Sequence, residues 1–425
     1  MEKTLHNTNS DRTNSVVPIL DKAIQFSLFT FVAFSMFSIS VTQISFAIGV
    51  IASLFKAHLT KSWKELRGSY VGIAILCFSL ASILSIITSV DFGNSLKLLK
   101  KLLQFIILFW VVNAFQDQKQ RDLFIKLIIV AGGATSLNGL LPLLKPSFFS
   151  PESLYGGLRP IGTMSVPSTF SGVLMIAGLV ALGRLLFHKP KEYWVIGGIG
   201  SIGLCLMLTY TRQAWLGFLI GSVFLLFFWN KKYLLLISLL LVGLLLSSTE
   251  GKSQGYQDGR LQLNIKDRLR SFTSLKDDSL QQRVSTWKVA WEILKDHPIT
   301  GCGYKCVDSI HSQYPDPSGK VALYRGMHSN LFQLLVDTGI IGLTTWLSIW
   351  IAYFIEVFKR WRPLTREKFQ ENTGILMGCS AAVLAYLVGG FFETNIYDSE
   401  VSMLIYFLMG LSLAQVEKLP QSNTH

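Results

Sequence analysis

The chain has 425 residues, of which 50% are hydrophobic, 12% aromatic and only 15% charged. Average globular domains carry roughly 25% charged residues, so this composition excludes an ordinary soluble domain. The formal net charge of +13 could suggest nucleic-acid binding, but the basic residues are scattered among short segments between apolar runs. That distribution is typical of lysine and arginine retained in the cytoplasmic loops of a membrane protein, and no nucleic-acid partner is expected.

The apolar runs predict an all-α polytopic membrane protein with about twelve transmembrane helices. A helix of about 20 apolar residues crosses a bilayer core of about 30 Å. Residues 1–22 are polar and are expected to form a cytoplasmic tail ahead of an uncleaved first span. Residues 23–248 are expected to hold spans one to nine, residues 331–415 spans ten to twelve, and residues 416–425 a second cytoplasmic tail. The runs lie near 23–41, 43–56, 71–89, 99–115, 123–144, 167–187, 194–210, 213–229, 233–248, 331–357, 374–392 and 400–415.

A polar cluster predicts a break between the seventh and eighth runs. Read as one helix, residues 194–229 would be about 54 Å long at 1.5 Å per residue, far longer than a bilayer requires. The break is expected at Thr209-Tyr210-Thr211-Arg212, the one polar cluster between the two runs.

Counting lysine and arginine in alternate short loops predicts the orientation of these spans. Both termini are expected in the cytoplasm, and the Arg212 turn, the 145–167 and 393–399 segments and residues 249–330 on the outer side of the inner membrane. Lys100 and Lys101, near the start of the fourth run, do not fit this count. The basic set comprises Lys56, Lys61, Lys64, Arg67, Lys119, Arg121, Lys189, Lys191, Lys231, Lys232, Lys359, Arg360, Arg362, Arg366 and Lys368, and the opposite set Lys97, Lys145, Arg159 and Arg212.

Residues 249–330 are expected to form one large, partly helical periplasmic loop. A helix is predicted over 281–296, which Ser279 could cap and which His297-Pro298 ends. Such a helix could lie on the membrane surface or cover a cavity. Its apolar face is formed by Val284, Trp287, Trp291 and Leu294.

The cysteines and acids give no indication of a metal site. Cys302 and Cys306 could pair in an oxidising compartment or remain free thiols, and no histidine accompanies them at zinc spacing. The outer side carries no Asp-x-Asp cluster. Any transferase activity is therefore expected to need no metal and no other cofactor, with positive side chains neutralising a leaving diphosphate.

Two arginines are candidates for phosphate binding. Arginine within a span costs roughly 3 kcal/mol on insertion scales and usually faces a polar cavity, although Arg212 could also reach the headgroups from a helix end. Arg283 lies one turn before Trp287 and is either a solvated loop residue or points toward the membrane mouth. Together the two guanidinium groups would suit a diphosphate, because guanidinium binds phosphate oxygens bidentately.

A histidine at the point where the loop re-enters the membrane is the candidate general base. His328 precedes Ser329-Asn330 and could simply cap the following helix, but imidazole titrates near neutrality and can accept a proton. Arg325 could share its face. The outer acids Glu393 and Asp398 could orient a histidine or bind sugar hydroxyls, or could be ordinary loop residues.

These residues, in this order, resemble the O-antigen ligase family of bacterial envelope glycosyltransferases. That family also contains O-antigen polymerases and protein O-oligosaccharyltransferases. The resemblance extends to the number of spans and to a large outer loop between spans nine and ten. Its motifs are Thr209-Tyr210-Thr211-Arg212-Gln213-Ala214-Trp215-Leu216-Gly217, the stretch from Arg283 through Trp287 to His297-Pro298-Ile299-Thr300-Gly301-Cys302-Gly303, and His328-Ser329 followed at the family's spacing by Gly339 and Gly342.

The resemblance implies a reaction and its partners. A glycan linked to undecaprenyl diphosphate in the outer leaflet would be transferred to a hydroxyl of lipid A-core, without metal or nucleotide. By the family pattern, Arg212 and Arg283 would bind the diphosphate and His328 would deprotonate or orient the acceptor hydroxyl.

Three other readings stay open. A polymerase would join lipid-linked repeat units with the same donor chemistry. A protein O-oligosaccharyltransferase often carries a further C-terminal outer domain. A transporter without catalysis would place paired charges or discontinuous helices along a transmembrane path, whereas the polar groups of this sequence gather on one face.

Overall fold

The computed structural model describes residues 2–60, 70–114, 118–144, 154–155, 159–188, 190–233, 278–316, 319, 321, 326–361 and 372–414. This part of the chain is almost entirely helical, as predicted, and its short strands pair antiparallel through Leu154–Pro160 and Tyr155–Arg159. The helices and strands are α1 (Glu2–Phe34), α2 (Ile39–Thr60), α3 (Tyr70–Ile87), α4 (Phe92–Lys97), η2 (Leu99–Phe105), α5 (Ile106–Ala114), α6 (Gln118–Leu144), β1 (Leu154–Tyr155), β2 (Arg159–Pro160), α7 (Pro167–Phe187), α8 (Trp194–Leu208), α9 (Arg212–Trp229), α12 (Asp278–Asp296), α13 (Val307–Ile310), η5 (His311–Gln313), α15 (Asn330–Trp361), α16 (Asn372–Gly390), η7 (Asn395–Tyr397) and α17 (Ser399–Leu413).

Among the described residues, eight helices are long and apolar enough to cross a membrane, and α8 and α17 are shorter apolar helices. The expected number of twelve is not reproduced. The run at 99–115 is divided between the 3-10 helix η2 and the short α5, and the run at 233–248 lies outside the described residues from position 234 onward. The helix α1 starts at Glu2, so the segment expected as a polar tail is helical, and its apolar span is Val16–Phe34.

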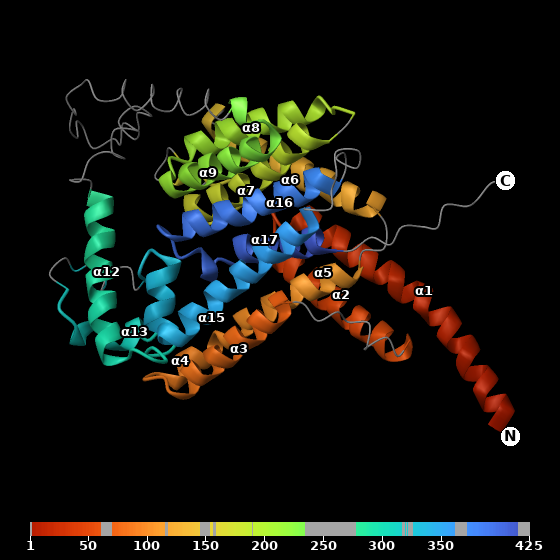
Figure 1. Cartoon of the computed structure of the whole chain (residues 1–425), viewed down its shortest axis with the longest axis horizontal. Helices are drawn as coiled ribbons and strands as arrows, with labels where there is room; N and C mark the ends of the chain where they lie inside the picture. Colours follow the sequence, from red (N-terminus) through yellow and green to blue (C-terminus); the bar gives the residue numbers. More distant parts are fainter. Residues whose placement is uncertain are drawn as a thin grey trace.

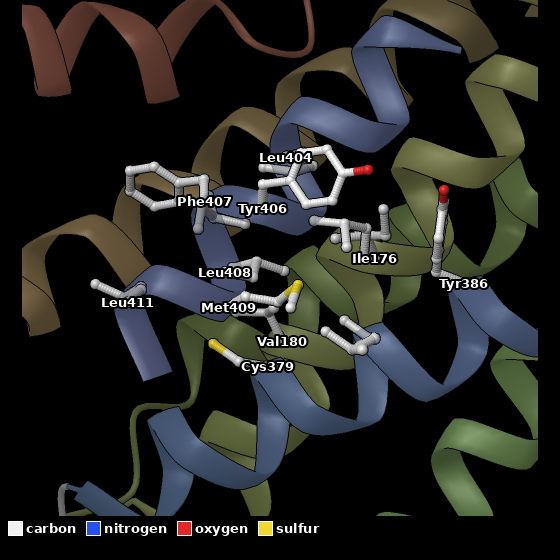
Figure 2. Close-up of a cluster of buried hydrophobic side chains, with 14 of the residues drawn as sticks. Ile176, Val180, Cys379, Tyr386, Leu404, Tyr406, Phe407, Leu408, Met409 and Leu411 are labelled. Atoms are coloured by element: carbon white, nitrogen blue, oxygen red, sulfur yellow. The ribbon is translucent and has the colours of Figure 1, made fainter. Parts of the chain in front are cut away.

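Apolar side chains fill the centre of the helix bundle and also form much of its surface. The helices α7, α16 and α17 form the centre, where Ile176, Cys379 and Phe407 are fully buried (Figure 2). Small residues allow close packing there, since a Cβ on Gly183 would lie 2.5 Å from Gly378 Cα. Ile44, Ile48 and Ile51, along one face of α2, are 52–67% exposed. Such an apolar surface suits contact with lipid.

The predicted break between the seventh and eighth runs is confirmed. The helix α8 ends at Leu208 and α9 begins at Arg212, and Tyr210 between them has φ +52°. Arg159 holds this turn, because its Nε donates to Thr209 O at 2.8 Å and its Nη2 to Thr211 Oγ1 at 3.1 Å.

One of the two basic residues that did not fit the loop count has a structural role. Lys101 donates from Nζ to Tyr397 O at 2.8 Å and to Ser399 Oγ at 2.5 Å. It therefore ties η2 to η7 and to the start of α17.

The segments that carry the second and third motifs gather at one end of the molecule. Figure 1 shows α12 and α13 there, beside α4 and the beginning of α15. The helix α12 begins at Asp278, which places Ser279 in its first turn and not at its cap, and ends at Asp296 directly before His297-Pro298, as expected.

Candidate active site

The helix that follows His328 is broken. In α15, Gly339 has φ +63° and ψ −164°, which separates residues 330–338 from residues 340–361. Only glycine adopts this conformation readily, because other residues have a Cβ. A break leaves carbonyl groups at the end of the first half and N–H groups at the start of the second half without helical partners.

The backbone of residues 298–303 supplies those partners. Cys302 N donates to Val336 O at 2.9 Å and Gly303 N to Asp337 O at 3.1 Å, while Ile340 N donates to Pro298 O at 3.0 Å. The two backbone segments are so close that a Cβ on Gly339 would lie 2.3 Å from Ile299 O. The second and third motifs therefore form one unit, in which close backbone packing requires Gly301 and Gly339.

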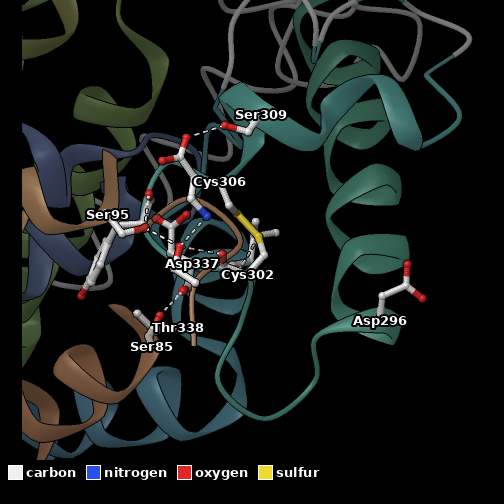
Figure 3. The surroundings of a disulfide bond; sticks show 12 residues. Ser85, Ser95, Asp296, Cys302, Cys306, Ser309, Asp337 and Thr338 are labelled. Atoms are coloured by element: carbon white, nitrogen blue, oxygen red, sulfur yellow. Dashed lines mark hydrogen bonds between the residues drawn. A yellow bond between two sulfur atoms is a disulfide. The ribbon is translucent and has the colours of Figure 1, made fainter. Parts of the chain in front are cut away.

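Hydrogen bonds to α3 and to the residues after it hold this unit in place, and a disulfide lies within it (Figure 3). Ser85 Oγ donates to Asp337 O at 2.6 Å, and Val90 N donates to Cys302 O at 3.0 Å. Cys302 and Cys306 are bonded and fully buried. Of the two alternatives that the sequence left open, the structure contains the disulfide.

The helix α12 packs one face against this unit and turns the other outward. Val289 and Ile293 are buried with Met327 in a small apolar core, whereas Trp291 is 53% exposed. The Trp287 ring stacks on Phe332 in the first half of α15 at a centroid distance of 5.0 Å. The predicted apolar face is thus only partly the buried one.

The three motifs meet at residues 392 and 393, shortly after the end of α16. Arg283 Nε donates to Phe392 O at 3.0 Å. His328 Nδ1 lies 3.7 Å from Glu393 Oε1, and Gln213 Nε2 donates to Glu393 Oε2 at 3.4 Å. Gln213 is the neighbour of Arg212, which begins α9. One carboxylate therefore links the histidine motif to the arginine motif.

The geometry at Glu393 favours one tautomer of the histidine. A carboxylate near Nδ1 favours the imidazole that carries its proton on Nδ1, which leaves the lone pair on Nε2. The distance of 3.7 Å exceeds that of a hydrogen bond. Both side chains are 27% exposed, but the Nε2 atom of His328 is itself buried.

The other candidate acid, Asp398, is separated from this site. Asp398 accepts a hydrogen bond of 2.5 Å from Thr169 Oγ1 at its Oδ2, on the far side of η7 from Glu393. Burial raises the pKa of Asp398 to about 7, while the Thr169 bond opposes that rise. Arg325 lies outside the described residues. Among the described residues no group of three or more His, Cys, Asp or Glu could hold a metal ion.

Two residues of the site were not singled out from the sequence. Gln213 lies inside the first motif next to Arg212, and a neutral amide at this position gives no sequence signal of its own. Asp337 is fully buried in α15 and accepts hydrogen bonds from Gln333 and Tyr397. An acid inside an apolar run is a signal of function or of polar contact, and that signal could have identified Asp337.

An apolar cavity of about 900 Å³ begins beside the site and follows α15. Its lining includes Asn330 and Phe391 at the end next to His328 and Glu393. It continues past Trp346 and Trp350 between α9, α15 and α16 to Lys359 and Trp361. The lining is almost wholly apolar, which suits a hydrocarbon chain.

A family model described as O-antigen ligase matches residues 197–347. The matched stretch contains the break before α9, the helix α12, the disulfide-linked turn and the broken start of α15. A search of curated proteins gave no match. Over residues 197–347, which carry all three motifs, this chain is therefore similar to the O-antigen ligase family.

Proposed function

We propose that this protein is an O-antigen ligase of the bacterial inner membrane, which transfers a glycan from undecaprenyl diphosphate to lipid A-core. The observation that carries the proposal is the meeting of three motifs at residues 392–393. The helix that begins with Arg212, the Arg283 side chain and the His328 imidazole come from distant parts of the sequence and converge on one short connection.

The histidine would act on the acceptor. With Nδ1 turned to Glu393, the proton of the acceptor hydroxyl would pass to Nε2 while the hydroxyl oxygen bonds to the anomeric carbon of the donor. Because Nε2 is buried in this structure, the step requires the surrounding side chains to move when the acceptor binds. The bond between that carbon and the phosphate oxygen breaks, and its electron pair leaves with the diphosphate. Glu393 stabilises the imidazolium that forms, as the carboxylate of a catalytic triad does. Attack opposite the leaving group inverts the anomeric centre.

The arginines would act on the donor. Arg212 and Arg283 bind the diphosphate and offset the charge that develops on the departing carrier. The fixed guanidinium groups would stabilise the charge on the leaving diphosphate, which a divalent cation does in other phosphate chemistry, so the proposed reaction needs no metal. It needs no nucleotide, because the donor already carries the activated bond between sugar and diphosphate.

The cavity along α15 would hold the carrier lipid. Its end at Asn330 and Phe391 adjoins the pair His328–Glu393, and it continues between α9, α15 and α16. A polyprenyl chain in this cavity places its diphosphate at the site. The disulfide Cys302–Cys306 is in keeping with a periplasmic position for the site, since disulfides persist in oxidising compartments.

The proposal is tested with purified protein, undecaprenyl-diphosphate-linked glycan and lipid A-core, with chelator present and nucleotide absent. Glycan on lipid A-core is the expected product. Longer glycan that remains on the carrier would assign a polymerase instead, and no transfer to either acceptor would refute the proposed reaction.

A further inference from the structure

His328 is held in a backbone conformation that non-glycine residues rarely adopt. Its φ is +47°, in the left-handed region. Such a conformation persists only where the surrounding structure determines it. The contacts of the preceding residue show what determines it here.

Met327 is fixed at both its backbone groups. Its N–H donates to Gln333 Oε1 at 3.1 Å, and its carbonyl accepts from Trp287 Nε1 at 2.9 Å. The Met327 side chain is fully buried. The peptide groups that lead into His328 are therefore held by one residue of α15 and one of α12.

The amide of Gln333 can point in only one direction. Its Nε2 donates to Asp337 Oδ1 at 3.1 Å and Oδ2 at 3.0 Å. The Asp337 carboxylate, which also accepts from Tyr397 OH, offers only acceptors when ionised. A reversed amide would set Gln333 Oε1 against this carboxylate, so Asp337 forces that oxygen toward Met327 N. Gln333 is 3% exposed and Asp337 fully buried.

The carboxylate opposite the histidine is tied to the same helix. Asn330 Nδ2 donates to Asn395 Oδ1 at 2.5 Å, and Ile396 N donates to Asn330 Oδ1 at 3.0 Å. The first half of α15 thus holds both the residue before His328 and the segment after Glu393.

We infer that Gln333, oriented by Asp337, is a positioning residue that sets the His328 imidazole against Glu393. The inference rests on the proposed function, because it gives the broken start of α15 a role in presenting the base. It explains why a buried acid and a buried amide lie one turn apart in an apolar helix: each satisfies the other, and the pair leaves one acceptor directed at Met327.

The direction of these hydrogen bonds allows a test by exchange. Gln333→Glu keeps an acceptor for Met327 N but faces the Asp337 carboxylate with a second negative charge. Asp337→Asn alone gives the Gln333 amide a second amide as partner and weakens the orientation. In the double variant Gln333→Glu/Asp337→Asn, the new amide at position 337 donates to the new carboxylate at position 333. The oxygen of that amide accepts from Tyr397, so the hydrogen bond between the two positions is restored with donor and acceptor reversed.

Two measurements report on the position of the His328 imidazole. We expect Gln333→Glu to lower kcat for glycan transfer on the order of 100-fold, the range of general-base catalysis, with little change in KM. We also expect faster carbethoxylation of His328 by diethyl pyrocarbonate, measured by mass spectrometry. The double variant should return both values toward wild type, and Gln313→Glu, at an exposed position, should change neither.

Wild-type kcat and labelling rate in Gln333→Glu would overturn the inference, and so would a folded double variant as impaired as the single one. If the single variant fails to fold, Trp287→Phe serves instead, since it keeps the ring on Phe332 but removes the donor to Met327 O. It should also speed labelling of His328, and an unchanged rate would contradict the inference. Labelling does not depend on transfer, so a wild-type protein with no ligase activity but the expected labelling pattern would refute only the proposed reaction.

Discussion

His328 Nδ1 lies 3.7 Å from Glu393 Oε1, and the two residues stand just before α15 and just after α16. Gln213 Nε2 reaches the other oxygen of the same carboxylate at 3.4 Å. The candidate site is thus assembled from the ends of α9, α15 and α16, and Glu393 is the residue that all of them share.

Glu393→Gln should lower kcat by at least roughly tenfold, because the neutral amide stabilises the imidazolium less than a carboxylate does. The loss should appear in kcat more than in KM, since the interaction strengthens only as the proton is transferred. Glu292→Gln is the control, because Glu292 is exposed and paired with Lys295 on the surface. Equal rates for the two variants would show that Glu393 has no part in the chemistry.

Arg283→Lys should lose activity although the positive charge is kept. The Arg283 Nε bond to Phe392 O fixes the guanidinium plane, and a lysine cannot offer both that contact and a paired contact to phosphate. We expect a loss on the order of tenfold, in the range for a charge-assisted hydrogen bond. Transfer kinetics with varied donor concentration measure it, and a fully active lysine variant would indicate that charge alone is sufficient.

Gly339→Ala should destabilise the fold by about 1–3 kcal/mol, because a non-glycine residue is strained at positive φ and its Cβ would lie 2.3 Å from Ile299 O. Gly197→Ala is the matched control, since nothing lies within 4 Å of a Cβ at that helical position. Thermal unfolding in detergent compares them. A Gly339→Ala protein with wild-type Tm would mean that residues 298–303 do not pack into the break as described.

Acidification should weaken the contact between α7 and the loop before α8. The hydrogen bond from Arg184 lowers the pKa of Glu192 from 4.5 to about 2. A lowered folded-state pKa stabilises the fold above the unfolded value, so this contribution is complete above pH 4.5 and is lost as the pH falls toward 2. Wild-type Tm should therefore drop in that window.

The control for this effect is Glu192→Gln. It should lower Tm at neutral pH and show a smaller further decrease between pH 4.5 and 2. If wild type and variant lose Tm in parallel across that window, the ion pair with Arg184 does not contribute to stability.

Local pattern was sufficient for much of the fold. Apolar runs predicted most of the long helices, and the polar cluster at Arg212 placed the break between α8 and α9. The C-terminal end of α12 at Asp296 was predicted, because the residue before a proline, here His297, disfavours the helical conformation. The same criterion overestimated the run at 99–115, where the chain forms a 3-10 helix before α5.

What could not be predicted depends on contacts between distant segments. The glycines of two motifs were recognised by spacing, but nothing in one sequence says that Gly301 and Gly339 meet across a broken helix. Lys101 did not fit the count of basic residues in alternate loops, and its amine donates hydrogen bonds to Tyr397 and Ser399. Asp337 stands out in the sequence as an acid inside an apolar run, but its partners Gln333 and Tyr397 follow only from the three-dimensional structure.

The most direct test of the proposed chemistry compares His328→Ala with His311→Ala in the transfer assay from undecaprenyl-diphosphate-linked glycan to lipid A-core. His311 lies in η5, away from Glu393, and serves as the matched histidine. We predict that His328→Ala abolishes transfer while the protein remains folded in the membrane, and that His311→Ala transfers at the wild-type rate. Wild-type transfer by His328→Ala would contradict the assignment of the base and, with it, the proposed site.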